Sequence, residues 1–201
     1  MEVSKAIELR RAVKAYDATH QMTEAEIERL MSLAMLAPTA WNVQHWRFVV
    51  VRDAELRQQI RANAWDQSQV TDASLLVIMT ADLAAWKKEP ARYFEGADAK
   101  TQDWLLTSMH QFYNGREWLQ RDDAIKSCGI AAATLMLAAQ EMGYDSCPMD
   151  GFDFDAIGKL IKLPQDHVVT MFVAIGKAAA PARPRSGKLP MSEVVVRDRF
   201  A

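Results

Sequence analysis

The chain of 201 residues is long enough for one domain with a substantial hydrophobic core. Half of its residues are hydrophobic and 25% are charged, and the net charge of −2 gives no reason to expect nucleic acid or a membrane as a partner. Two cysteines are too few for a disulfide framework, and we find neither a signal-peptide pattern nor an apolar run that could span a membrane, so we expect a cytoplasmic protein.

Hydrophobic spacing and capping residues predict several helices. In the first third of the chain we expect them at Val3–Arg11, Thr23–Ala37 and Asp53–Ala64. Val3 and Ile7 would face inward in the first helix. The capping-box sequence Thr23-Glu24-Ala25-Glu26 starts the second helix, and Pro38 stops it. Later helices are expected at Asp122–Met142, which is rich in small residues and ended by Gly143, and at Asp155–Ile161.

Three short apolar runs predict strands. They lie at Arg47–Arg52, Leu75–Thr80 and Val168–Ile175. Each run is continuously apolar rather than alternating, which favours strands buried on both faces. We expect Cys147–Asp153 to be a loop. Together with the helices, these strands predict an α+β fold in which many helices surround a small central sheet.

The glycines and the basic residues limit how a phosphorylated cofactor could bind. None of the eight glycines forms a GxG pair, so the chain has neither a dinucleotide fingerprint nor a P-loop. Side chains would have to supply the phosphate-binding charge. Two clusters offer it, and they consist of Arg10, Arg11 and Lys14 near the N-terminus and Arg183, Arg185 and Lys188 in the tail. Either cluster alone is more often structural than a phosphate site, because cations commonly stabilise a helix C-terminus or simply face solvent.

The loop Ala37–Trp46 carries more functional groups than a connection needs. It contains a hydroxyl, two side-chain amides (Asn42 and Gln44), an imidazole (His45) and two tryptophans. Such a loop on a rigid scaffold is typical of a binding site, although its tryptophans could equally complete the core. The four histidines show no metal-ligand spacing, and we find no catalytic triad or paired catalytic carboxylates. We therefore expect no metal.

Five motifs in order along the chain resemble the FMN-dependent nitroreductase family. RRAVKAYD at Arg10–Asp17 resembles the family's RRSxRxF signature, and APTAWNVQHWRF at Ala37–Phe48 resembles APSSxNxQPWRF. The polar segment before the second strand, from Gln67 to Ser74, is also similar. The last two matches are the helix and G-x-x-x-x-P-x-x-G-F-D loop at Leu135–Asp153 and the Gly187-Lys188-Leu189-Pro190 element. The resemblance implies a nitroreductase-like fold with a small mixed sheet and an intertwined homodimer.

The resemblance also implies a cofactor site at the dimer interface. The residues expected to bind FMN are Arg10, Arg11, Ala12, Lys14, Pro38, Thr39, Ala40, Asn42, Gln67, Gln69, Pro148, Met149, Asp150, Gly151, Arg185 and Lys188. Arg10, Lys14 and Lys188 would bind the phosphate, and the segment from Pro38 to Asn42 would come from the partner subunit. A backbone N–H near Asp150 or Gly151 would point at flavin N5, with no catalytic side chain identified.

Some residues depart from the family pattern. Ala12 replaces the usual serine and Lys14 the commoner arginine, which turns a bidentate contact into a point charge. Asp150 replaces a glutamate, and Lys188 replaces an arginine. His45 stands where the family usually has proline, which makes it the least explained residue of its loop.

The implied activity is oxidoreduction. NAD(P)H would pass a hydride through flavin N5 to a nitroaromatic, a quinone or a similar small-molecule acceptor in a ping-pong cycle. The chain would form one domain, with residues 86–119 as an aromatic-rich helical excursion over the flavin and residues 177–201 as a basic C-terminal arm. Phe112 and Tyr113 are the candidate substrate contacts. The alternatives are a reductive dehalogenase or other dedicated flavoenzyme of this fold, a non-catalytic flavin-binding protein, and a helical interaction protein.

Overall fold

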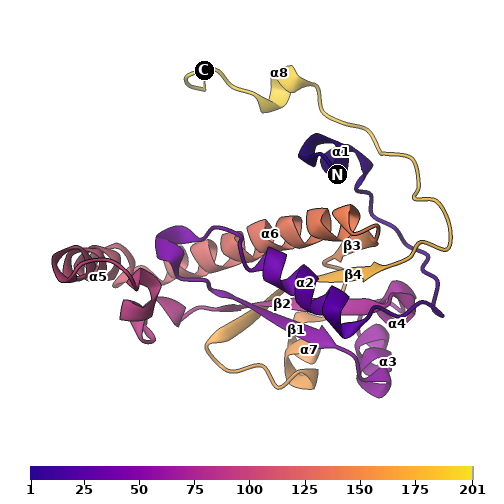
Figure 1. Ribbon diagram of the computed structural model, residues 1–201, viewed down its shortest axis with the longest axis horizontal. Coiled ribbons are helices and arrows are strands. Elements are labelled where there is room, and N and C mark those ends of the chain that lie inside the picture. Colours follow the sequence, from indigo (N-terminus) through magenta and orange to yellow (C-terminus); the bar gives the residue numbers. More distant parts are fainter. Residues whose placement is uncertain (201) are drawn as a thin grey trace.

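The computed structural model describes residues 1–200 and is built on a four-stranded sheet in the order β1-β2-β4-β3 (Figure 1). The strands are β1 (Trp46–Val51), β2 (Leu75–Asp82), β3 (Asp145–Met149) and β4 (His167–Gly176). All three strand pairings are antiparallel, whereas a mixed sheet was expected. In addition, Ala12, which lies outside the four strands, forms an isolated parallel bridge with Ser146 of β3.

Strand position within the sheet decides how far each predicted strand is buried. Every residue of β2 is buried, as its apolar run predicts, because β2 pairs with β1 on one side and β4 on the other. The expectation that β1 is buried on both faces is wrong. β1 is an edge strand that pairs with β2, and its middle residues are only partly buried.

The segment expected to be a loop at Cys147–Asp153 in fact begins within a strand. Residues Asp145–Met149 form β3, and Cys147 lies opposite Ala174 of β4. Pro148 sits inside this strand, where it donates no backbone hydrogen bond. Proline is tolerated here because β3 is at the edge of the sheet, where one side of the strand needs no partner.

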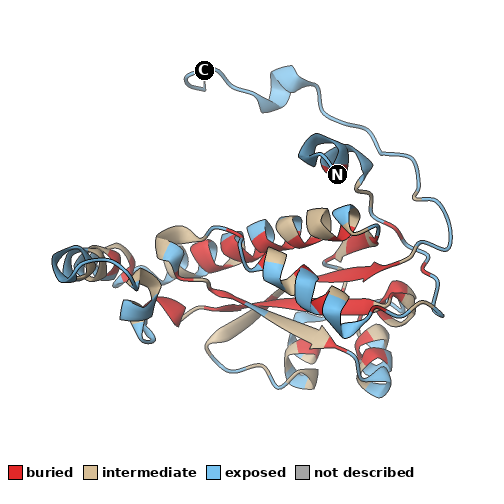
Figure 2. Ribbon diagram, viewed as in Figure 1, coloured by how far each residue is buried: buried red, intermediate tan, exposed pale blue. Residues whose placement is uncertain are grey.

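Helices cover both faces of the sheet and create two cores (Figures 1 and 2). The helices are α1 (Val3–Leu9), α2 (Glu24–Ala34), α3 (Ala54–Ala62), α4 (Gln69–Asp72), α5 (Ala99–Tyr113), α6 (Glu117–Glu141), α7 (Phe154–Leu160) and α8 (Met191–Val194), with 3₁₀ turns η1 (Ala40–Asn42), η2 (Ala85–Lys87) and η3 (Pro90–Phe94). Leu75 and Val77 pack against α2 and α6, whereas Leu76 and Ile78 pack against α3, α4 and α7. This alternation follows from the two-residue period of a strand.

Helix ends follow their predicted capping residues. The Thr23 hydroxyl accepts from the backbone N–H of Glu26, and the Glu26 carboxylate accepts in return from the backbone N–H of Thr23 at 2.8 Å. This capping box is confirmed. Gly143 follows α6 with φ of +76°, as expected of a C-terminal glycine cap.

Helix α1 departs from its prediction in length and orientation. It ends at Leu9 rather than Arg11. Val3 and Ile7 are 71% and 56% exposed, so the prediction that they face inward is wrong for the single chain, and only Ala6 of this helix is buried. α1 and the C-terminal arm stand away from the sheet (Figure 2). Across residues 1–200, no helix has both the length and the apolar character that crossing a membrane requires.

Candidate functional site

The two basic clusters predicted from the sequence meet in one cavity of about 730 Å³. Its cationic lining consists of Arg10, Arg11, Lys14, Arg183, Arg185 and Lys188, with Ala12 and one carboxylate, Glu8, beside them. Arg11 donates to the backbone carbonyl of Arg183 at 2.5 Å, and Arg185 donates to that of Glu8 at 2.7 Å. These bonds fasten the C-terminal arm to the segment after α1. The remaining cations face one another with little acidic compensation, which favours a multiply charged anion.

The way in which Arg10 and Lys14 come together differs from the prediction. They share no helical face, because α1 ends before them. Instead the chain is held along the edge of β3, where the backbone N–H of Val13 donates to the carbonyl of Ser146 at 3.1 Å. Burial raises the pKa of the Cys147 thiol in β3, and Lys14 acts in the opposite direction through its charge. Lys14 therefore lies between the basic cavity and β3.

A relay of side-chain amides connects α4 to the loop after β3. Gln69 is buried, and its amide donates to the Gln67 amide oxygen at 3.0 Å. Gln67 in turn donates to the carbonyl oxygen of Gly151 at 3.0 Å. The two predicted amide ligands and the predicted loop thus form one connected unit. The two residues between Pro148 and Gly151 differ in exposure. Asp150 is exposed, whereas the side chain of Met149, the last residue of β3, is buried in the core and leaves its backbone as the available contact.

The Trp65 ring closely approaches Gly151. A Cβ atom added at this position would lie 2.7 Å from ring atoms Cε3 and Cζ3 of Trp65. A side chain there would therefore displace the indole. Trp65 is a site residue that was not predicted, because a lone tryptophan between Ala64 and Asp66 carries no local signal of what it contacts.

The loop before β1 lies near α5, at the opposite end of the sheet from the segment after α1 and the start of the C-terminal arm (Figure 1). The Thr39 hydroxyl accepts from the backbone N–H of Gln44 at 2.9 Å, and the Asn42 amide donates to the carbonyl of Tyr93 at 3.0 Å. Pro38 is exposed, and Ala40 is partly buried. One chain therefore does not bring this part of the predicted site to the basic cavity.

The two aromatic residues proposed as substrate contacts have different surroundings. Tyr113 has no exposed surface, and its hydroxyl donates to Asp123 at 3.1 Å, so it packs within the chain rather than facing a substrate. Phe112 keeps some exposed surface and packs against Trp41 of the loop before β1, with ring centroids 5.8 Å apart. Phe112 is thus the member of the pair that a ligand could reach.

His45 is buried beneath the same loop. Its Nδ1 lies 3.4 Å from the Ser127 hydroxyl of α6, and its Nε2 has no hydrogen-bond partner within residues 1–200. Burial lowers its pKa to about 4, so the ring is neutral near pH 7. Of the two tryptophans of this loop, Trp46 is the one that completes the core.

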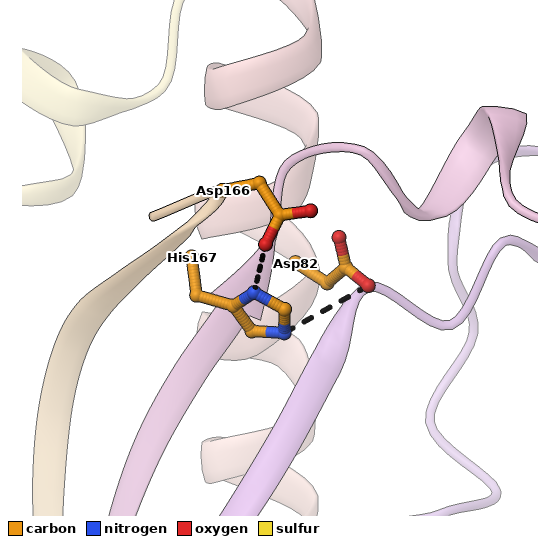
Figure 3. A group of neighbouring side chains, drawn as sticks. All are labelled: Asp82, Asp166 and His167. Carbon is orange, nitrogen blue, oxygen red and sulfur yellow. Dashed lines mark hydrogen bonds and ion pairs between the residues drawn. The ribbon is translucent and has the colours of Figure 1, made fainter. Parts of the chain in front are cut away.

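An ion-pair cluster joins the ends of β2 and β4 (Figure 3). The Asp82 carboxylate lies 2.9 Å from the ammonium of Lys88 and 3.8 Å from His167 Nε2, while Asp166 lies 2.7 Å from His167 Nδ1. Arg47 also pairs with Asp82. The hydrogen bonds from Lys88 and His167 hold the pKa of Asp166 at about 2. Lys88 bridges the carboxylates of Asp82 and Asp166, so side chains of the protein itself balance the negative charge of the cluster. Lys88 also ties the start of the helical excursion at residues 86–119 to the sheet.

Comparisons with known proteins agree with this architecture. The sequence profile described as the Nitroreductase family matches residues 7–177. The chain is 45% identical to Protein DrgA of Synechocystis sp. over 200 residues, covering 97% of this chain and 95% of that protein. It is 33% identical over 201 residues to YodC of Bacillus subtilis, named as a candidate NAD(P)H nitroreductase, with 96% of each chain covered.

A solved structure points the same way. A candidate nitroreductase of Exiguobacterium sibiricum, crystallised in complex with FMN, superposes with a TM-score of 0.89 at 25% identity and covers 98% of both chains.

Proposed function

Because the chain belongs to the nitroreductase family, we propose that it is an FMN-dependent oxidoreductase that uses NAD(P)H to reduce nitroaromatics, quinones or similar small molecules. The observation that carries the proposal is the convergence of six cationic side chains, from two ends of the chain, on one cavity beside β3. The FMN bound to the Exiguobacterium sibiricum structure supports the choice of cofactor.

The residues present fit FMN. Arg10, Lys14 and Lys188 supply the charge for its phosphate, while Arg11 and Arg185 hold the arm in place. Gln67 and Gln69, which are hydrogen-bonded to each other, would bond the ribityl chain or the pyrimidine edge of the flavin. The Trp65 ring fills the space that a side chain at Gly151 would occupy, so a flavin ring would meet Gly151 through its backbone, beside that indole.

Bound FMN would supply the hydride chemistry, in a ping-pong cycle with NAD(P)H and then the acceptor at the same place. The protein itself would bind the cofactor, orient it and the acceptor, and polarise the flavin ring. Arg10 and Lys14, if they reach the ring edge as well as the phosphate, would stabilise negative charge on the reduced cofactor. A backbone N–H at Asp150 or Gly151 would be fixed by the Gln67 contact to the Gly151 carbonyl. Phe112 would border the acceptor.

We further propose that two chains form an intertwined homodimer. The segment from Pro38 to Asn42 would then complete the partner's site, because within one chain it lies far from the basic cavity. Large exposed apolar side chains support a second copy as their cover. They are Val3 and Ile7 of α1 and, in the arm, Leu189, Met191, Val194, Val195, Val196 and Phe200. So many large apolar side chains left exposed in two short segments are unusual on a monomer.

Titration with FMN, followed by quenching of flavin fluorescence, tests the cofactor assignment. We expect saturation at one FMN per chain, together with a dimer mass in sedimentation equilibrium. A protein that stays colourless and leaves flavin fluorescence unquenched would contradict both the enzyme and the flavin-carrier readings. If FMN binds but NADH and NADPH both fail to reduce it, a non-catalytic flavin carrier is favoured. Reoxidation by a haloaromatic but not by a nitroaromatic would favour a dehalogenase.

A further inference from the structure

Trp65 is an exposed tryptophan that touches the loop of the proposed ring site. It is 79% exposed, although a buried indole would stabilise the fold far more. One ring edge, Cε3 and Cζ3, lies against Gly151 at the position that a Cβ atom would occupy. The indole therefore covers one side of this glycine and leaves most of its own surface free.

The backbone that presents Trp65 is strained and held in place. Trp65 and Asp66 both have left-handed conformations, with φ of +53° and +51°, which are costly for residues with side chains. Arg61 stabilises the turn twice. Its Nε donates to the Asp66 carboxylate at 2.7 Å, and its carbonyl accepts from the backbone N–H of Asp66 at 3.2 Å. Strain that neighbouring groups maintain in this way is typical of functional sites.

The same turn fixes Gly151 from two directions. Gln67, two residues after Trp65, donates to the Gly151 carbonyl oxygen, while the indole edge lies against the position that a Cβ atom of Gly151 would occupy. A molecule that approaches the exposed edge of this loop therefore meets an aromatic surface whose position is already set.

We infer that Trp65 is a specificity-determining residue that forms an aromatic wall for flat acceptors. The inference rests on the proposed function, because Gly151 marks the edge of the flavin ring only if FMN binds there. A quinone or nitroaromatic beside Gly151 would pack against the indole and gain the stabilisation of an aromatic pair. A compact inorganic acceptor such as ferricyanide has no flat face and would gain nothing from Trp65.

The test measures reoxidation of the reduced, FMN-loaded protein by two acceptors. The protein is reduced anaerobically with dithionite and mixed with 1,4-naphthoquinone or ferricyanide in a stopped-flow instrument. We expect Trp65→Ala to slow reoxidation by naphthoquinone about tenfold at sub-saturating acceptor and to change the ferricyanide rate by less than about twofold. Trp65→Phe should restore most of the naphthoquinone rate. Phe154→Ala removes an exposed aromatic side chain on α7 and serves as the matched control.

Three results would overturn the inference. Equal losses with both acceptors would mean that Trp65 only positions the loop. An unchanged naphthoquinone rate would mean that the acceptor does not meet the indole. Loss of bound FMN in Trp65→Ala, with retention in Trp65→Phe, would make Trp65 a cofactor contact instead. Failure of the unmodified protein to bind FMN would contradict the proposed function itself, so the two failures are distinguishable.

Discussion

Replacing His45 with asparagine tests whether the loop before β1 is held by a buried, neutral imidazole. The asparagine amide can keep a contact to Ser127 near the position of Nδ1 but has no group that titrates. His45 has no exposed surface, and burial is the largest effect on its pKa; Arg47 adds to this effect, and the nearby carboxylates of Asp123 and Asp82 only partly oppose it. The folded protein therefore resists protonation of this ring.

The sign and size of the effect follow from the two pKa values. In the unfolded chain His45 has its ordinary value of 6.5, whereas in the folded protein the value is about 4. Between these values the unfolded state binds more protons, so stability falls as pH falls and the loss is complete below pH 4. Between pH 7 and pH 5, the two pKa values correspond to a loss of about 2 kcal/mol from His45 alone.

The assay is unfolding by guanidinium chloride, monitored by tryptophan fluorescence at one protein concentration and at both pH values. His45→Asn lowers stability at pH 7 as well, so the informative quantity is the difference between pH 7 and pH 5 within each protein. We expect that difference to be smaller in the variant by about 2 kcal/mol. Equal pH-dependent losses in the two proteins would refute the account of His45 as a buried neutral base.

Three further substitutions test separate parts of the structure. Arg10→Ala should weaken FMN binding by about 1.5–3 kcal/mol if the guanidinium binds the phosphate, whereas the exposed control Arg29→Ala on α2 should not; equal affinities would remove Arg10 from the site. Gly151→Ala should cost about 1–3 kcal/mol of FMN affinity by displacing the Trp65 ring, and adding Trp65→Ala should relieve it; no relief would disprove the steric argument. Thr23→Ala should lower the free energy of unfolding by about 1 kcal/mol through loss of the helix cap, and an unchanged unfolding midpoint would contradict that role.

Elements stabilised by neighbouring residues could be predicted from the sequence. Thr23 and Glu26 interact across a single helical turn, so their pattern locates the start of α2. β2 is apolar throughout because it is central, and its run is sufficient to identify it. β3 was missed because Pro148 indicates a loop wherever the position of a strand in the sheet is unknown.

The surroundings of a side chain were harder to predict than its secondary structure. The spacing of Val3 and Ile7 indicates an apolar helix face but cannot say whether the same chain or a second copy covers it. The two basic clusters are joined by a contact between Arg11 and Arg183, which are 172 positions apart. No local pattern links residues so distant, and only the resemblance to a known family placed them together. Trp65 had no counterpart in the motifs and became visible through its contact with Gly151.

Anaerobic titration of the FMN-loaded protein with NADH and with NADPH tests the central claim most directly. We expect at least one of the two nucleotides to bleach the visible absorption band of the bound flavin, and a nitroaromatic or a quinone then to restore it. The Arg10→Ala variant should show the same bleaching and recovery, but only at a higher FMN concentration, because it binds FMN more weakly. A bound flavin that neither nucleotide bleaches, or a bleached flavin that neither acceptor reoxidises, would contradict the assignment of this chain as an NAD(P)H oxidoreductase.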